Sequence, residues 1–310
     1  MFSTAVLTRH LHALVARGGL ALATGALRRL PPGDRAWLAR HLLQDRFHGN
    51  ARMLAGFFQN ALAGWHNNQH QVLLNGEAQL LRRLAPFGPR VVFDVGANDG
   101  DWSVACAEAL PDADIHAFEI DPTTAAALRD HLATKAPRAR VNALGLSDKA
   151  GEVSIFLQPG ITTQTSLVGP KTAEPGGEVA GLESKVVHVK TGDAYVTEHQ
   201  IASIDLLKLD VEGAEPKVLD GFRGCFEQRR ITLVQFEYGG VNASIRYLLE
   251  DFYHFFRRHG FVVGKLYPEG VAFKEYEVTD EDFRGPNFVA CRQDRPDIVA
   301  ALRCAPLQPL

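Results

Sequence analysis

The segment VVFDVGANDG, residues 91–100, constrains the fold of this chain more than any other segment. Its apolar run breaks at Asp94 into a short loop that contains Gly96 and Gly100. A continuous apolar run is typical of a buried parallel strand, and glycine allows both a left-handed backbone and a close approach of the chain to a ligand. The next residues, DWSVACAEAL, repeat small and apolar side chains at helical spacing. The segment therefore predicts a strand, a ligand-binding turn and a helix in that order.

The spacing of these glycines bears on the kind of cofactor that the turn would hold. A dinucleotide turn has the pattern G-x-G-x-x-G and places a pyrophosphate on a helix N-terminus. Here the pattern is G-x-x-x-G, and Asp94 and Asp99 would put negative charge beside a pyrophosphate. The same charge favours a cofactor that carries an ammonium group. We therefore expect S-adenosylmethionine, with a dinucleotide as the alternative.

A second predicted strand, residues 114–118, leads to Glu119. A carboxylate at the end of this strand can accept hydrogen bonds from both hydroxyls of a ribose. Dinucleotide enzymes use the same contact, so Glu119 does not separate the two cofactors. The expected cofactor-binding residues are Asp94, Gly96, Asn98, Gly100, Glu119, Asp121, Ala143, Leu144 and Asp210.

From Val91 onward, predicted strands and helices alternate, which is typical of a doubly wound parallel α/β sheet. The helix expected at about 243–259 carries an aromatic stripe, which we assign to the core, and it ends at Gly260. No crossover helix separates the last two strands, which indicates an antiparallel end to the sheet. The predicted strands are 91–95, 114–118, 139–144, 204–209, 231–237, 261–267 and 287–292.

Residues 1–85 form the first of two expected parts and predict helices. One helix ends near Leu30, a second is capped by Asp34 and runs to about His48, and a third ends near Gly64. We expect this region to be a lid or an oligomer contact, through which the chain could form a homo-oligomer.

Residues 86–310 form the second part, an α/β domain with an insert at 151–200. The insert contains two strand-like runs, VSIFL and KVVHV, on either side of a long loop rich in glycine, proline and threonine. Loops of that length are usually lids or disordered segments. We expect residues 159–183 to be a mobile lid.

Four segments of the chain resemble the FkbM-type methyltransferases. They are FDVGANDGDWS (93–103), AFEIDP (117–122), NALGLSDKAG (142–151) and IDLLKLDVEGAEPKVLDGF (204–222). The last is similar, nearly residue for residue, to the hallmark segment of that family. The resemblance implies a class I methyltransferase fold, S-adenosylmethionine as methyl donor, and usually transfer to a hydroxyl of a small molecule or sugar.

Three acids are the candidate catalytic residues, Asp210, Glu212 and Glu237, because they lie at predicted strand ends, where open α/β sheets bind ligands. They could hold a divalent cation that positions an acceptor hydroxyl, or they could polarise the hydroxyl by themselves. No metal is predicted, and Asp210 and Glu237 are the candidate general bases. Glu215 is interpreted as a residue that favours a helix N-terminus through the helix dipole. The candidate acceptor contacts are Thr165, Ser166 and Tyr238.

The composition of the chain disfavours several classes of binding partner. The net charge of the 310 residues is −3 and the arginine pairs are scattered, so we do not expect a nucleic-acid substrate. The four cysteines lie far apart, which disfavours a zinc site or a disulfide framework and favours the cytoplasm. No apolar run approaches the ~20 residues of a membrane helix. The sequence predicts a cytoplasmic methyltransferase with a small-molecule or glycan acceptor; the alternatives are a dinucleotide-dependent oxidoreductase and a noncatalytic binding module.

Overall fold

The computed structural model describes residues 25, 27–42, 49–158, 161–166 and 183–304, and the chain divides into two compact units, 1–62 and 63–310. Helix α2 spans Pro32–Leu42 and α3 spans Gly49–Trp65. The end of the third helix near Gly64 is confirmed. The predicted start of the second at Asp34 is wrong, because proline fits the first helical turn, where its missing N–H is not needed. The helix expected before Leu30 and the stretch to His48 fall largely outside the described residues.

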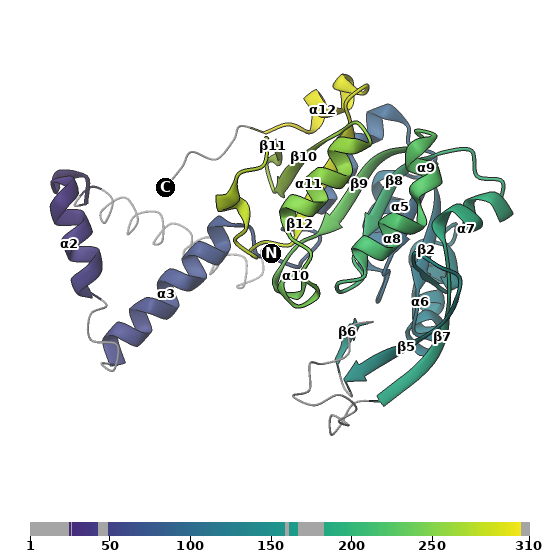
Figure 1. Cartoon of the computed structure of the whole chain (residues 1–310), viewed down its shortest axis with the longest axis horizontal. Helices are drawn as coiled ribbons and strands as arrows, with labels where there is room; N and C mark the ends of the chain where they lie inside the picture. Colours follow the sequence, from purple (N-terminus) through teal and green to yellow (C-terminus); the bar gives the residue numbers. More distant parts are fainter. Residues whose placement is uncertain (1–24, 26, 43–48, 159–160, 167–182, 305–310) are drawn as a thin grey trace, which may run out of the picture. The chain divides into compact units, whose positions relative to one another are not determined.

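The main sheet of the second unit is mostly parallel (Figure 1). Its strands are β1 (Val91–Val95), β2 (Asp114–Glu119), β3 (Arg140–Ala143), β8 (Ile204–Leu209), β9 (Ile231–Glu237), β10 (Phe261–Tyr267), β11 (Gly270–Phe273) and β12 (Asn287–Arg292). Within the described residues, their order is β11-β10-β12-β9-β8-β1-β2-β3. Neighbouring strands pair in parallel along the series β3, β2, β1, β8 and β9. Strand β12 is antiparallel to both β9 and β10.

This topology confirms the doubly wound fold with an antiparallel end. Each predicted strand is present, with bounds that agree within one residue. The short strand β11, which pairs antiparallel with β10, is an addition that the sequence analysis did not anticipate.

Helices cover both faces of this sheet (Figure 1). One face is covered by α4 (Glu77–Leu84), α5 (Asp101–Ala109), α6 (Pro122–Lys135) and α12 (Pro296–Leu302). The other is covered by α7 (Gly192–Glu198), α8 (Glu215–Gly221), α9 (Arg223–Glu227) and α11 (Leu249–Arg258). Val92 packs in the first core and Phe93 in the second, as the two-residue period of a strand requires. No helix in the described part of the chain is long and apolar enough to cross a membrane.

Helix α4 belongs to the second unit, so the boundary between the two parts lies at about residue 63 and not at 85. Leu80, Leu81 and Leu84 are buried in the core that α4 shares with α5 and α12. A short 3₁₀ helix, η1 (Ala85–Phe87), then leads to β1. Helical periodicity shows that α4 has an apolar face, but it does not show which core receives that face.

The single helix predicted at 243–259 is wrong, because the structure has α10 (Gly240–Ile245) followed by α11. Arg246 ends α10 with a left-handed backbone, φ 58°, and Asp251 accepts a hydrogen bond from the Leu248 N–H at the start of α11. The assignment of the aromatic stripe to the core is confirmed by the burial of Phe252 and Phe256. A 3₁₀ helix, η2 (Val278–Asp280), lies between β11 and β12.

Strands of the insert form a second sheet with β4, which precedes the insert, in the order β4-β7-β5-β6. Its strands are β4 (Gly145–Leu146), β5 (Gly151–Gln158), β6 (Ile161–Ser166) and β7 (Glu183–Lys190). The runs VSIFL and KVVHV lie in β5 and β7, which pair antiparallel. Strand β6 and Glu183, the first residue of β7, occupy part of the expected lid; its other residues, 159–160 and 167–182, lie outside the described residues. Lys185 Nζ donates to Asp121 Oδ1 over 3.0 Å, which ties β7 to the start of α6.

Candidate active site

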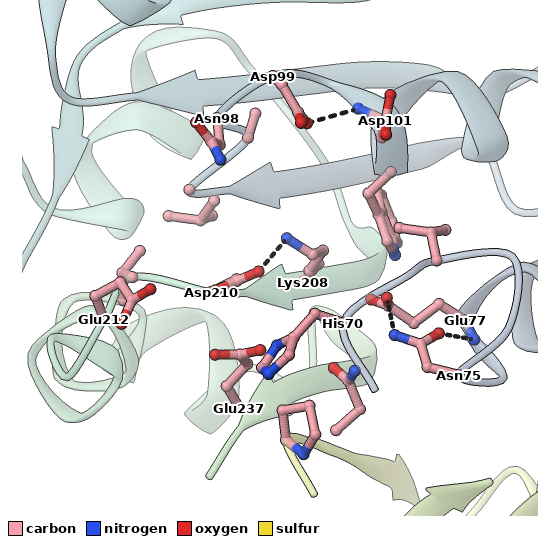
Figure 2. Close-up of a pocket in the computed structure, with 18 of the residues that line it drawn as sticks. His70, Asn75, Glu77, Asn98, Asp99, Asp101, Lys208, Asp210, Glu212 and Glu237 are labelled. Atoms are coloured by element: carbon pink, nitrogen blue, oxygen red, sulfur yellow. Dashed lines mark hydrogen bonds and ion pairs between the residues drawn. The ribbon is translucent and has the colours of Figure 1, made fainter. Parts of the chain in front are cut away.

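A cavity of about 1090 Å³ opens at the carboxyl ends of the parallel strands (Figure 2). The loops after β1, β2, β8 and β9 line it, together with the segment before α4. Open α/β sheets bind ligands at this edge. Small-molecule sites typically span roughly 300 to 1,000 Å³, so this cavity has room for a cofactor and an acceptor together.

The turn after β1 passes very close to the loop after β8. A Cβ atom added at Gly96, where φ is 86°, would lie 1.8 Å from the carbonyl oxygen of Asp210. Glycine is therefore required at this crossing. Asn98 also lines the cavity and has φ 46°, a left-handed conformation that asparagine tolerates better than most residues. Gly100 does not line the cavity; a Cβ there would lie 2.6 Å from Leu128 Cδ1, so it allows α5 to approach α6.

The Glu119 carboxylate is buried at the wall of the cavity. Its Oε2 accepts a hydrogen bond from the Asn98 N–H over 3.0 Å, and its Oε1 accepts one from the Asp121 N–H over 2.9 Å. Burial raises the pKa of Glu119 despite these hydrogen bonds. A carboxylate has about four acceptor positions, so each oxygen can accept one further hydrogen bond from a ligand.

Asp121 lies behind this wall and does not line the cavity. It caps α6 by accepting from the Thr124 N–H over 3.1 Å, and it pairs with Lys185. Burial acts to raise the pKa of Asp121, but the hydrogen bonds from Lys185 and Thr124 outweigh burial and lower it. The structure therefore gives Asp121 a capping role at the start of α6.

A chain of charges, Asp94–Lys208–Asp210, joins β1 to β8; its first two members are buried and Asp210 is half-buried. Lys208 Nζ lies 3.2 Å from Asp94 Oδ1 and 3.2 Å from Asp210 Oδ2. Asp94 is fully buried, accepts from Ser103 Oγ over 2.7 Å, and does not line the cavity. Burial opposes the charge of Lys208, but Asp210 and Asp94 outweigh it and raise the pKa of the ammonium group. Lys208 is not among the residues predicted from the sequence, although a single lysine within the apolar strand IDLLKL was a usable signal.

The three predicted catalytic acids come together at one side of the cavity (Figure 2). Burial, and then repulsion by Asp210, raises the pKa of Glu212 to about 7. Burial, followed by Asp210 and Glu212, raises the pKa of Glu237 well above its usual range. Glu212 also has a left-handed backbone, φ 51°, which costs a non-glycine residue roughly 1 to 2 kcal/mol. Such strain is common in residues that a site holds in place.

Glu215 shapes the loop that carries these acids. Its Oε1 accepts from the Val211 N–H over 3.0 Å and from the Gly213 N–H over 3.3 Å. Burial raises the pKa of Glu215 to about 7. Its place at the start of α8 agrees with the predicted role at a helix N-terminus. The two hydrogen bonds also hold the loop between β8 and α8.

Not all of the other residues predicted to contact the cofactor or the acceptor line the cavity. Leu144 lines the cavity, whereas Ala143 does not. Tyr238 forms part of the wall, but it is fully buried and its hydroxyl donates to Glu281. Thr165 and Ser166 lie on β6, and their side chains are outside the described part of the structure.

The wall contributed by residues 66–77, before α4, was also missed from the sequence. Its lining residues include Asn68, His70, Gln71, Asn75 and Glu77. The polar run NNQHQ followed by NGE, between two helices, was the available signal. Within the described residues, no group of three or more His, Cys, Asp or Glu side chains is arranged to hold a metal ion.

The raised pKa values of Glu212 and Glu215 predict how stability changes with pH. Both values are about 7, above the usual 4.5, so the unfolded chain ionises first as the pH rises. We expect the melting temperature of the ligand-free protein to fall as the pH rises from about 4.5 to 7. Thermal unfolding of wild type, Glu212→Gln and Glu215→Gln across this range tests the prediction. Both variants should show a shallower fall, and a slope equal to that of wild type in both would contradict the assignment.

The doubly wound sheet with its antiparallel end, the glycine turn after β1 and the acids after β8 and β9 define a class I methyltransferase. The chain matches the Methyltransferase FkbM domain model over residues 94–263. It therefore belongs to the FkbM family of S-adenosylmethionine-dependent methyltransferases, which sets aside the dinucleotide alternative.

Named relatives agree with this assignment. The chain is 31% identical over 195 residues to 31-O-demethyl-FK506 methyltransferase FkbM of Streptomyces tacrolimicus, covering 56% of this chain and 73% of that protein. It is 32% identical over 191 residues to methyltransferase sdnD of Sordaria araneosa, covering 54% and 73%. It is 26% identical over 184 residues to the hexuronic acid methyltransferase AglP of Haloferax volcanii, covering 57% and 70%.

Proposed function

We propose that this enzyme transfers the methyl group of S-adenosylmethionine to a hydroxyl of a sugar or another small molecule. The observation that carries the proposal is the cavity, which Gly96 and Glu119 line together with Asp210 and Glu237. The relative 31-O-demethyl-FK506 methyltransferase is an O-methyltransferase by its name, and AglP is named for a sugar acid. These names support an oxygen acceptor and a sugar-like substrate class.

Several residues that line the cavity fit S-adenosylmethionine. Glu119 has free acceptor positions for two ribose hydroxyls, and Leu144 offers an apolar surface beside it. The Nε1 of Trp102 is buried in the cavity wall and has no hydrogen-bond partner among the described residues. Buried polar groups are rarely left unpaired in native proteins. We assign this N–H to a ligand that occupies the cavity.

Methyl transfer requires little covalent chemistry from the protein. S-adenosylmethionine supplies a methyl group already activated on a sulfonium. The protein must align the acceptor, exclude water and take up the acceptor proton. Alignment can lower the activation barrier by ~7 to 11 kcal/mol. A general base can raise the rate ~10²- to 10⁴-fold. Glu237 is a candidate for the base role because it lines the cavity at the end of β9. Asp210, held by Lys208, is the second candidate.

The proposal is tested by incubating the purified protein with methyl-labelled S-adenosylmethionine and a mixture of small hydroxylated acceptors, including simple glycosides. We expect label in an alkali-stable ether product, and binding of S-adenosylhomocysteine by calorimetry. Absence of cofactor-product binding would contradict the proposed function directly. Label found only on nitrogen or carbon would contradict the choice of oxygen as acceptor atom.

Glu119→Ala should weaken the binding of S-adenosylhomocysteine. The variant cannot accept the two proposed hydrogen bonds from the ribose hydroxyls, and it also leaves the Asn98 and Asp121 N–H groups without their acceptor. We therefore expect about a 10- to 100-fold loss of affinity. Isothermal titration calorimetry provides the measurement. Glu227→Ala, which removes an exposed carboxylate outside the cavity, is the matched control and should bind as wild type does. An unchanged affinity in Glu119→Ala would refute the ribose contact.

A further inference from the structure

Residues 66–77, which we call the strap, form a wall of the cavity that lies outside the family-model match at 94–263. The strap connects α3 to α4 and contributes mostly polar side chains to the cavity. They are Asn68, His70, Gln71, Asn75 and Glu77. Because this wall precedes the matched region, its chemistry is a property of this chain that membership of the family does not supply.

Buried hydrogen bonds hold both ends of the strap. Near its start, Asn67 Nδ2 donates to the carbonyl oxygens of Asn75 over 2.7 Å and Leu266 over 2.9 Å. Near its end, Glu77 accepts from Asn75 Nδ2 over 2.6 Å and from Gln235 Nε2 on β9. Asn67, Asn75 and Glu77 are all less than 8% exposed. The two ends are therefore fixed on β9 and β10, and the strap is a preformed wall.

Between these fixed ends, His70 is exposed and lines the cavity. In Figure 2 its imidazole extends from the strap toward Glu237 at the end of β9. An acceptor hydroxyl that is to lose its proton to Asp210 or Glu237 must lie on this side of the cavity. The rest of that acceptor then meets His70 and the neighbouring amides of the strap.

The residues on this side offer no positive charge to an anionic acceptor. Three carboxyl groups, those of Asp210, Glu212 and Glu237, line the space. Among the described lining residues, Lys208 is the one lysine or arginine, and it is bound between two carboxylates. An additional carboxylate or phosphate would enter without a cation to pair with it, which is unfavourable.

The polar groups of the strap suit hydroxyls instead. An amide side chain both donates and accepts hydrogen bonds, and so does a neutral imidazole, as a hydroxyl group does. We propose that the strap is the acceptor-recognition wall of this enzyme and that it selects an uncharged, polyhydroxylated acceptor, with His70 binding a hydroxyl beside the one that is methylated. This proposal rests on the proposed function, and it departs from the sugar acid in the name of AglP.

The substrate class is tested with methyl glycosides in matched pairs that differ only at C6, where one member has a hydroxymethyl group and the other a carboxylate. Gluco, galacto and manno pairs are incubated with the full chain and methyl-labelled S-adenosylmethionine. We expect transfer to the neutral member of at least one pair, with kcat/KM at least about tenfold above that of its uronate, the effect of one well-formed hydrogen bond or unpaired charge. Equal or faster transfer to the uronates, or transfer to no glycoside, overturns the proposal.

Binding of S-adenosylhomocysteine, measured in the same preparations, separates the two levels of inference. If it binds and the glycoside result is negative, the acceptor proposal fails while the proposed function stands. If it does not bind, the proposed function itself fails.

The role of His70 is tested by His70→Ala, which should raise KM for the preferred glycoside about tenfold and leave the affinity for S-adenosylhomocysteine unchanged. His70→Gln keeps a hydrogen-bonding group and should recover part of the loss. The matched control is His254→Ala, on the exposed side of α11 and outside the cavity, which should behave as wild type. An unchanged KM in His70→Ala overturns the assignment of His70, and so does an equal loss in His254→Ala.

Discussion

Asp210→Asn should abolish most methyl transfer while the affinity for S-adenosylhomocysteine stays about normal. The substitution keeps the shape of the side chain and removes the charge beside Lys208 and Glu237. If Asp210 takes up or directs the acceptor proton, the expected loss is ~10²- to 10⁴-fold in kcat, the usual contribution of general base catalysis. Steady-state kinetics with labelled methyl donor, together with calorimetry of cofactor-product binding, gives both quantities.

Asp205→Asn is the matched control, because Asp205 lies on the same strand β8 and its carboxylate binds the Arg90 and Val91 N–H groups away from the cavity. It should keep both activity and binding. A kcat close to wild type in Asp210→Asn would eliminate Asp210 as base or metal ligand. Dialysis against a chelator then separates the remaining roles: activity that survives chelation supports direct action by the carboxylates, and activity lost and restored by Mg²⁺ or Mn²⁺ supports a bound cation.

Much of the site was predictable because topology alone brings strand ends together. Asp210, Glu212 and Glu237 are far from Gly96 and Glu119 in sequence, but parallel strands that share one sheet present their carboxyl ends at one edge. Apolar runs mark such strands even in a single sequence. The acids could therefore be placed at the edge before their distances were known.

The direction of a side chain was harder to predict than its position. Asp94 lies near the end of β1 as expected, but its carboxylate turns to Lys208, 114 residues further along the chain, and to Ser103. Nothing local to FDVGANDG indicates this partner. Likewise, the strap depends on contacts such as the one between Glu77 and Gln235, which are 158 residues apart. Local patterns identified the elements, whereas these long-range partners required the packed structure.

The second large effect expected concerns stability, and it arises at Lys208. Lys208→Met removes the cation from a site where Asp94 is fully buried, so that, among the described residues, Asp94 keeps only the hydrogen bond from Ser103. Removing one partner of a buried ion pair typically lowers the free energy of unfolding by ~3 to 5 kcal/mol, because the remaining charge is buried without a partner. Equilibrium unfolding in urea should show a loss of this size. Lys190→Met, which breaks the exposed pair with Glu198, is the matched control and should cost less than about 1 kcal/mol.

The double variant Asp94→Asn/Lys208→Met separates the buried charge from simple loss of packing. It removes the cation and the uncompensated carboxylate together, and the amide side chain that replaces the carboxylate of Asp94 can still accept from Ser103. If charge is the cause, the double variant should be more stable than Lys208→Met alone, even when that single variant does not fold. If the double variant is as unstable as the single, the loss comes from other contacts of the lysine side chain, such as the cation–π contact of Lys208 Nζ with the Trp102 ring at 5.7 Å. The coupling between the two positions thus measures how strongly the buried ion pair links the cofactor turn to the catalytic strand end.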